Sequence, residues 1–324
     1  MNLLSKDFLI DGSKLVEPVL VTGAGGCIGA WVVGILATSG ARCVAFDLRD
    51  DRRRPALLMG EKAAADLVWE TGDIADATRL NEVVSKHRIG SIIHLAGLQI
   101  PFCKADPAAG ARVNVVGTIN ILEAARKTGI SRTAYASSTA AHGMPPGGKW
   151  IATLYGAYKL ANEQTAGVYW LDWQVPSVGL RPNVVYGLGR DQGMTSKFTA
   201  AIQAAVMGEA YEIPYSGPIS WLHAGEAASA FIAAISRDTE GAPVFDLNGD
   251  CETVEQGLKI LGGLVPDHRI SITGGPLPVP PDLDDAPARA FLGNYASVGI
   301  RDGIEATYRD LNSLWADGRL GPLN

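Results

Sequence analysis

Between positions 18 and 180, short apolar runs alternate with longer segments in which apolar residues recur every three or four positions. The short runs are rich in valine and isoleucine, which is typical of buried strands, and the longer segments have the spacing of helices. The predicted strands cover residues 19–21, 43–46, 67–69, 91–95, 133–136 and 177–180. The predicted helices cover residues 28–38, 77–87, 107–127 and 153–173. This alternation predicts βαβ units and a parallel sheet.

Beyond position 181 the pattern is looser, with predicted helices over 196–207 and 224–236, a strand over 244–247, and a proline-rich stretch over 275–281. We therefore expect an α/β fold: a doubly wound parallel sheet of the Rossmann type, mainly over residues 1–182. Residues 183–324 would mainly form a smaller C-terminal substrate-binding part, with some return to the sheet. Sheets of this type bind ligands at the carboxyl ends of their strands, where the smaller part would lie.

Composition narrows the classes of partner and compartment. Hydrophobic residues make up 47% of the 324 residues and charged residues 19%, which is typical of a folded chain. The net charge of −6 disfavours nucleic acid and an anionic membrane surface as partners. The four cysteines lack the paired spacing of a zinc or dithiol site, so no metal is expected. Neither a signal-type nor a membrane-spanning apolar run is present, and we expect a cytoplasmic protein.

A cluster of glycines follows the first predicted strand and opens the first predicted helix. Its members are Gly23, Gly25, Gly26 and Gly29, with Cys27 and Ile28 among them. Glycine lets the backbone turn tightly, and the N–H groups of a helix start attract a pyrophosphate. Asp47 ends the second strand, where a carboxylate accepts hydrogen bonds from a ribose and repels a 2′-phosphate. We expect NAD as the cofactor rather than NADP, although Arg49 and the arginines at 52–54 offer an alternative phosphate site.

Two further segments end strands at the same predicted edge of the sheet. Asp73 and Ile74 follow the third strand, where they would contact an adenine ring. Leu95, Ala96 and Gly97 come at the end of the fourth strand, where the small residues would let a cofactor lie close. His94, just before them, is expected to be structural.

Tyr155 and Lys159 begin the helix predicted after the fifth strand. A spacing of four places both on one face, one turn apart. A neighbouring ammonium favours the phenolate, so we expect Lys159 to lower the pKa of Tyr155 toward the range of a general base. Ser138, or as second choice Thr139, lies at the end of the fifth strand, where a hydroxyl can polarise the reacting oxygen. Alone, the tyrosine–lysine spacing also fits an ordinary amphipathic helix start.

Together these segments resemble the extended short-chain dehydrogenase/reductase superfamily, and within it the NAD-dependent epimerase/dehydratase family. The segments that carry the resemblance are Thr22–Gly29, Asp73, Asn114 in 113–118, Ser137–Ser138, Tyr155–Lys159 and 180–182. The resemblance implies that Ser138, Tyr155 and Lys159 form the catalytic triad and that Asn114 supports the cofactor site. It further implies that Pro182 and Asn183 form part of the nicotinamide wall, and that the chain forms a homodimer.

Two departures from this family's patterns bear on the substrate. The dehydratases carry an acidic pair after the catalytic hydroxyl, whereas Thr139, Ala140 and Ala141 follow Ser138, so dehydration is disfavoured. Many nucleotide-sugar epimerases place a diphosphate-binding arginine where Ile219 stands, and an uncharged side chain cannot make that contact. We expect a small substrate without a nucleotide diphosphate, such as a sugar, a sugar acid or another polyol.

Further candidates for the substrate pocket are Gln99, Thr139, His142, Arg190 and Trp221. Arg190 lies in a glycine-rich loop and could hold a carboxylate through two hydrogen bonds; the alternative is an exposed arginine paired with its neighbour in sequence, Asp191. For His142 the alternative is a packing role.

Three functions remain open at this point. The leading hypothesis is a dehydrogenase that moves a hydride between a secondary alcohol or ketone and the nicotinamide. The second is an epimerase of a sugar or nucleotide-sugar that retains its NAD and returns the hydride to the opposite face. A third, of another class, is a non-catalytic NAD(H) sensor, which would have no need of a tyrosine–lysine pair.

Overall fold

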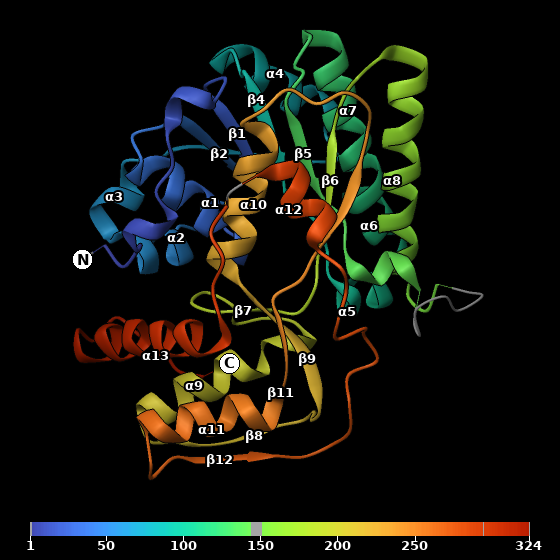
Figure 1. The fold of residues 1–324 in the computed structure, drawn as a ribbon. Coiled ribbons are helices and arrows are strands. Elements are labelled where there is room, and N and C mark those ends of the chain that lie inside the picture. Colours follow the sequence, from blue (N-terminus) through green and yellow to red (C-terminus); the bar gives the residue numbers. More distant parts are fainter. Residues whose placement is uncertain (1, 144–150, 294, 324) are drawn as a thin grey trace.

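The centre of the molecule is a seven-stranded parallel sheet with the strand order β10-β6-β5-β4-β1-β2-β3 (Figure 1). The computed structural model describes residues 2–143, 151–293 and 295–323. The strands are β1 (Val19–Thr22), β2 (Cys43–Asp47), β3 (Val68–Thr71), β4 (Ser91–His94), β5 (Thr133–Ala136), β6 (Val178–Pro182) and β10 (Val244–Leu247). All seven predicted strands are present, with ends shifted by a residue or two. The strand order reverses between β1 and β4, which is where doubly wound sheets open a crevice for ligands.

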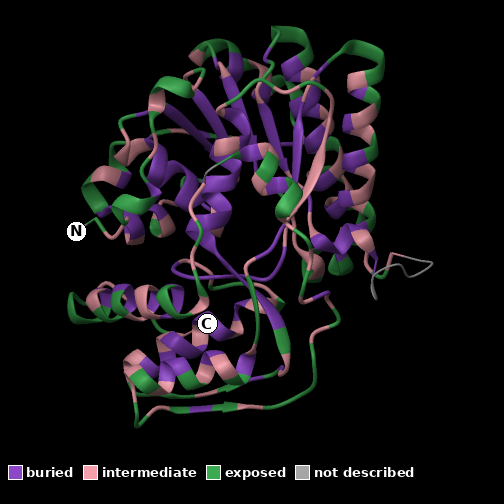
Figure 2. Ribbon diagram, in the orientation of Figure 1, coloured by how far each residue is buried: buried purple, intermediate pink, exposed green. Residues whose placement is uncertain are grey.

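Helices cover both faces of this sheet because alternate side chains of each strand point to opposite faces. Val19 and Val21 of β1 pack into a core with α1 (Cys27–Thr38) and α10 (Ala224–Ile235), while Leu20 packs into the core on the other face. That second core includes residues of α4 (Ala77–His87), α7 (Gly117–Thr128) and α8 (Leu154–Trp173). Figure 2 shows the central strands buried between these layers.

The helix predicted over 107–127 is interrupted. The structure has α6 (Pro107–Ala111), a turn of π-helix η3 (Arg112–Val116) and then α7. Within η3 the backbone carbonyl of Asn114 accepts hydrogen bonds from two side chains, Thr118 Oγ1 at 2.8 Å and Asn162 Nδ2 at 2.9 Å. These side-chain donors occupy a carbonyl that a regular helix would pair with its own backbone, so the wider turn is accommodated.

The C-terminal elements form a smaller region below the carboxyl edge of the sheet (Figure 1). It contains a three-stranded sheet of β7 (Val185–Tyr186), β9 (Pro218–His223) and β11 (Asp250–Thr253), and a pair of strands, β8 (Ala210–Ile213) and β12 (Arg269–Ile272). Its helices are α9 (Lys197–Met207), α11 (Val254–Leu264) and α13 (Ile300–Ala316). The chain returns to the main sheet with α10, β10 and α12 (Ala286–Leu292).

The remaining elements are short. They are η1 (Lys6–Phe8), η2 (Gly12–Lys14), α2 (Arg53–Met59), α3 (Glu61–Ala65), α5 (Ile100–Ala105), η4 (Thr139–His142) and η5 (Met194–Ser196). Within the described residues, none of the helices combines the length and apolar character needed to cross a lipid bilayer.

Candidate active site

Two adjoining cavities open at the carboxyl edge of the parallel sheet, one of about 290 Å3 and one of about 530 Å3. They share a set of residues from the glycine turn, the end of β4 and the loop after β7. The shared residues are Gly23, Gly26, Cys27, Leu95, Gly97, Gln99 and Arg190. A single extended ligand can therefore lie across both.

The glycine turn forms the floor where the cavities meet. Gly23 has a φ of +71°, and a Cβ there would lie 2.7 Å from the backbone nitrogen of Ala96. A Cβ on Gly29 would collide with the carbonyl oxygen of Gly23, so α1 can approach β1 closely only with glycine at this position. Helix α1 starts after Gly26 with no side-chain cap, which leaves the N–H groups of its first turn available to an anion.

Asp47 lies at the end of β2 and contacts the glycine turn. Its Oδ2 accepts a 2.9 Å hydrogen bond from the Gly25 N–H, and its Oδ1 accepts one of 2.7 Å from Leu48. Burial raises the pKa of this carboxyl above its usual value, and the two backbone donors oppose that shift. Asp47 lines the larger cavity together with other residues predicted for the cofactor site, Asp73, Ile74, Leu95, Ala96 and Gly97.

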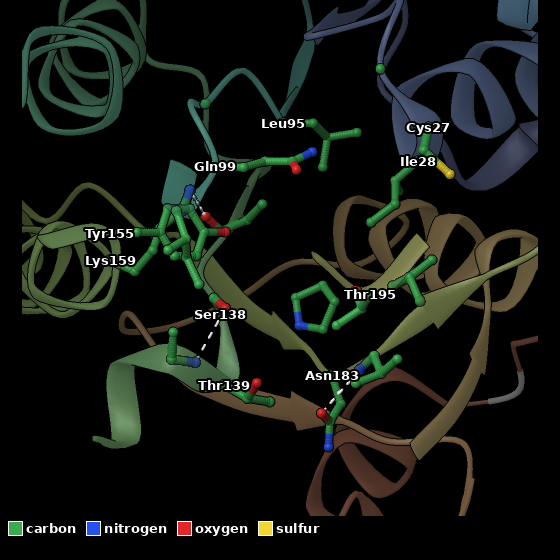
Figure 3. Close-up of a pocket in the computed structure, with 18 of the residues that line it drawn as sticks. Cys27, Ile28, Leu95, Gln99, Ser138, Thr139, Tyr155, Lys159, Asn183 and Thr195 are labelled. Carbon is green, nitrogen blue, oxygen red and sulfur yellow. Dashed lines mark hydrogen bonds between the residues drawn. The ribbon is translucent and has the colours of Figure 1, made fainter. Parts of the chain in front are cut away.

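Ser138, Tyr155 and Lys159 meet in the smaller cavity (Figure 3). Thr153 caps α8 by accepting a 3.0 Å hydrogen bond from the Gly156 N–H, which places Tyr155 in the first turn. Ser138 caps η4 in the same way, accepting a 3.2 Å hydrogen bond from the Ala140 N–H. The two caps hold the hydroxyl groups of Ser138 and Tyr155 at the cavity wall.

The sequence predicts a lowered pKa for Tyr155, whereas the pKa of this phenol lies above its usual value in the structure. Burial raises the pKa of Tyr155 above its usual value, and a hydrogen bond with Ser138 offsets only part of that shift. The Lys159 ammonium instead donates a 2.6 Å hydrogen bond to the Ala136 carbonyl and lies 5.6 Å from the centre of the tyrosine ring. Burial also lowers the pKa of Lys159 to about 8.

Arg190, Gln99 and Thr139 also line the smaller cavity. The alternative in which Arg190 pairs with Asp191 is wrong, because Asp191 forms a 2.6 Å ion pair with Arg54 of α2. The Arg190 guanidinium donates a 3.0 Å hydrogen bond to Thr195 Oγ1. Arg190 is therefore directed into the cavities rather than toward its neighbour in sequence.

Two of the predicted pocket residues lie elsewhere. Trp221 is fully buried within the smaller region. The centre of its ring lies 4.5 Å from that of Phe198, and its indole N–H donates a hydrogen bond to the Glu252 carbonyl. His142 Nε2 lies 2.7 Å from Asp246 Oδ1 and 3.2 Å from an Arg181 nitrogen. Neither side chain lines either of the two described cavities. Trp221 belongs to the core of the smaller region, and His142 joins η4 to β10 and β6.

The residues expected to support the cofactor site lie around its edges. Asn114 is buried and donates hydrogen bonds to the carbonyls of Leu98 and Gly110, which fastens the loop after β4. Pro182 and Asn183 line the smaller cavity at the end of β6. Asn183 Nδ2 is held by Asn248 Oδ1 at 2.8 Å and the Pro280 carbonyl at 2.9 Å.

Several residues that line the cavities have no strong signal in the sequence. Met194, Thr195 and Val279 reach the smaller cavity from the looser C-terminal pattern, and Arg54 reaches the glycine turn from α2 with a 2.6 Å hydrogen bond to the Gly25 carbonyl. In the sequence Arg54 is only one member of an arginine run whose other members pair locally, and no local signal links it to Asp191.

Comparisons with known proteins show which proteins the chain is similar to. A curated UDP-glucose 4-epimerase of Rhizobium leguminosarum bv. trifolii is 36% identical over 130 residues, which span 40% of this chain and only 38% of that protein. A UDP-glucose 4-epimerase from Thermotoga maritima, solved with UDP-glucose, superposes with a TM-score of 0.78 at 21% identity and covers 92% of this chain and 99% of that one. An L-threonine dehydrogenase from Clostridium difficile gives the same TM-score at 20% identity over 95% of this chain and 100% of that one, so these two likenesses define the fold alone.

The family model described as "NAD dependent epimerase/dehydratase family" matches residues 19–248. This segment contains the whole parallel sheet, the glycine turn and the Ser138, Tyr155 and Lys159 cluster. The chain therefore belongs to the NAD dependent epimerase/dehydratase family.

Proposed function

We propose that this protein is an NAD-dependent oxidoreductase that moves a hydride between the nicotinamide and a secondary alcohol or ketone of a sugar, a sugar acid or a small polyol. The observation that carries the proposal is the convergence of Ser138, Tyr155 and Lys159 on a cavity continuous with the glycine turn. A dinucleotide laid across both cavities would bring its reactive end to these three side chains.

The residues present fit such a dinucleotide. Asp47, Asp73 and Ile74 would hold the adenosine in the larger cavity, and the open start of α1 would hold the pyrophosphate. Pro182 and Asn183 would face the nicotinamide in the smaller cavity. The close approach of Gly23 and Gly29 to neighbouring backbone supports this placement, because a side chain at either position would close the floor.

NAD is favoured over NADP by the charges near the ribose end. The Asp47 carboxylate would accept hydrogen bonds from ribose hydroxyls and repel a 2′-phosphate. Arg49 also lines the larger cavity, but the other three nearby arginines are already paired with carboxylates: Arg52 with Asp50 and Arg53 with Asp51, each at 2.6 Å, in addition to the Arg54–Asp191 pair. Their charges are therefore largely balanced before any cofactor binds.

The proton transfer follows from the positions of the hydroxyls. Ser138 would donate a hydrogen bond to the reacting oxygen, and Tyr155, as phenolate, would take the proton from the substrate hydroxyl. The bound nicotinamide supplies the hydride acceptor. The Lys159 ammonium, fixed by the Ala136 carbonyl, would stabilise negative charge on the phenol oxygen.

An epimerase that retains its cofactor is the second candidate, and the 36% identity to a UDP-glucose 4-epimerase favours it. Against a nucleotide-sugar substrate stands Ile219, which is buried in β9 and carries no charge for a diphosphate. Cofactor that remains bound through dialysis, with no net NADH formed from any sugar in a panel, would decide for epimerisation.

The Tyr155→Phe variant tests the catalytic assignment. We expect turnover to fall by about 100- to 10,000-fold while NADH binding stays within a fewfold of the wild type. Tyr158→Phe is the matched control, because Tyr158 lies on the same helix but donates its hydroxyl to the Pro107 carbonyl and lines neither cavity. Unchanged turnover in Tyr155→Phe would contradict the assignment, whereas a wild-type protein that binds NADH but converts nothing in a broad panel of polyols and sugar acids would favour a sensor.

A further inference from the structure

We propose that Arg190 is the anion-binding residue of the substrate site, so that the substrate carries a carboxylate beside its reacting alcohol. The substrate class is then a hydroxy acid, such as a sugar acid, rather than a neutral sugar or polyol. This inference rests on the proposed oxidoreductase function and makes it more specific.

The loop that carries Arg190 is shaped to present its side chain. The Arg190 N–H donates a 3.0 Å hydrogen bond to the Gly187 carbonyl, and Gly187, Gly189 and Gly193 all have positive φ angles. A Cβ on Gly193 would collide with the Gln99 amide oxygen and lie 3.3 Å from an Arg190 nitrogen. Gln99, Gly193 and Arg190 therefore meet closely at the cavity wall, where only glycine allows the approach.

The hydrogen-bonding capacity of Arg190 is mostly unused. A guanidinium has five N–H donors, and among the described residues Arg190 uses one, to Thr195 Oγ1. Its Nε is buried and has no hydrogen-bond partner in the described part of the chain. A buried donor on a cation is costly to leave unpaired, so the arrangement calls for an acceptor from a ligand.

The charges around the smaller cavity have the same implication. Of the described residues that line it, Lys159 and Arg190 are cationic and none is a carboxylate. Asp191, the nearest carboxylate in sequence, is taken by Arg54. The larger cavity has charges of both signs: four aspartates (Asp47, Asp51, Asp73 and Asp191) and four arginines (Arg49, Arg53, Arg54 and Arg190) line it. The smaller cavity is therefore suited to a negatively charged ligand, and a planar carboxylate matches a guanidinium.

Two ligands could supply the anionic oxygens: the carboxylate of a substrate or the pyrophosphate of the cofactor. The substrate carboxylate is favoured as the ligand of Arg190 because of the neighbours of this side chain. Arg190 donates a hydrogen bond to Thr195 and adjoins Gln99, and its charge also acts on Tyr155. The pyrophosphate already has the open start of α1. Because the charge of Arg190 also reaches Cys27 at that helix start, the experiment must separate the two sources.

The test compares Arg190→Met and Arg190→Lys with the wild type and with Arg301→Met, a control at an exposed arginine of α13. Oxidation is measured on matched acid and neutral pairs: glucuronate and glucose, gluconate and sorbitol, glycerate and glycerol. NADH affinity is measured by fluorescence. We expect the wild type to prefer an acid over its neutral partner by about 100-fold, Arg190→Met to lose that preference, and Arg190→Lys to keep part of it. NADH affinity should change less than about threefold.

A second measurement keeps the proposal testable if none of these compounds is oxidised. Calorimetry follows tartrate, with threitol as its neutral counterpart, binding to NADH-loaded protein. We expect tartrate alone to bind and its affinity to fall at least about 10-fold in Arg190→Met. Arg190-dependent tartrate binding without any turnover would refute the oxidoreductase and leave the anion site standing.

Other outcomes overturn the anion site itself. Turnover with no preference for acids in the wild type would leave the oxidoreductase standing but contradict the role of Arg190. A large loss of NADH affinity in Arg190→Met, with the acid preference intact, would assign Arg190 to the pyrophosphate. Failure of the wild type to bind tartrate and to oxidise any acid would also refute the proposal.

Discussion

Lys159 Nζ lies 5.6 Å from the centre of the Tyr155 ring and is held there by a 2.6 Å hydrogen bond to the Ala136 carbonyl. The ammonium is therefore positioned by the end of β5 and not by the phenol one turn before it on α8. Both groups are buried, and burial disfavours the charged form of each. A phenolate and an ammonium at this spacing can stabilise each other, but only in a pH range where the lysine keeps its proton.

That range gives the first prediction. Burial lowers the pKa of Lys159 to about 8, so its ammonium is present below that pH and lost above it. Alcohol oxidation needs Tyr155 as a proton acceptor, so its rate should rise with pH until Lys159 begins to lose its charge. We expect kcat for oxidation to rise up to about pH 8 and then level off or fall. Arginine keeps its proton throughout this range, so Lys159→Arg should move the alkaline limit upward. Superimposable pH profiles for the two proteins would contradict this role.

The second prediction concerns cofactor choice at Asp47. Asp47→Asn removes the negative charge but keeps an oxygen that can accept a hydrogen bond from Gly25 or Leu48. Because repulsion of a 2′-phosphate is then lost, we expect the preference for NAD over NADP, taken from kcat/KM for each, to fall about 10-fold or more. Asp73→Asn is the comparison, since it lies in the same cavity. It should weaken both cofactors similarly, and an equal effect of the two substitutions would argue against ribose recognition by Asp47.

The third prediction concerns the release of the cofactor. Arg54 joins α2 to Asp191 in the loop after β7 and also bonds the Gly25 carbonyl, so this ion pair crosses the glycine turn. We expect this pair to loosen when a dinucleotide enters or leaves. Because the Asp191 side chain is 39% exposed, water screens the ion pair, and the pair should hold the closed loop only modestly. Asp191→Asn should therefore speed NADH release by about threefold to tenfold in stopped-flow measurements.

The control for that experiment is Asp50→Asn, which breaks the local Arg52–Asp50 pair near the start of α2; neither residue lines a described cavity. It should leave the release rate within about twofold of the wild type, because this pair does not join two separate segments. An equal acceleration in both variants would mean that general loss of charge near the site, and not the connection to the loop, controls release.

The parts of the fold and site that the sequence predicts are those with a local signature. The strand ends, the glycine turn and the Tyr155–Lys159 spacing each depend on a few adjacent residues, and the structure places them as expected. The prediction that Trp221 lines the substrate pocket is wrong because the sequence pattern around an aromatic residue near the end of a strand is the same whether the residue faces a cavity or a core. Its burial against Phe198 depends on how α9 packs on β9, which no local pattern encodes.

Contacts between segments that are far apart in the chain could not be predicted from the sequence either. Arg54 and Asp191 are 137 positions apart, and nothing in either segment indicates that the other faces it. The π-helical turn at Asn114 depends on Asn162, which comes from a different helix 48 positions later. Both features arise from tertiary contacts that override local helix and charge patterns.

The last prediction separates a glycine required by the site from one that is not. A Cβ on Gly29 would collide with the Gly23 carbonyl oxygen, so Gly29→Ala must push α1 away from β1 and open the turn. We expect NADH affinity to fall by more than about 10-fold, together with a loss of about 1–3 kcal/mol in the free energy of unfolding. Gly167, in the middle of α8, has open space where a Cβ would be added. Gly167→Ala should therefore stabilise the protein by about 0.5–1 kcal/mol and leave NADH affinity unchanged, because alanine favours the helix over the unfolded chain. Calorimetric melting and NADH titration of the two variants measure both effects, and equal NADH affinity in Gly29→Ala and the wild type would show that the turn does not hold the cofactor.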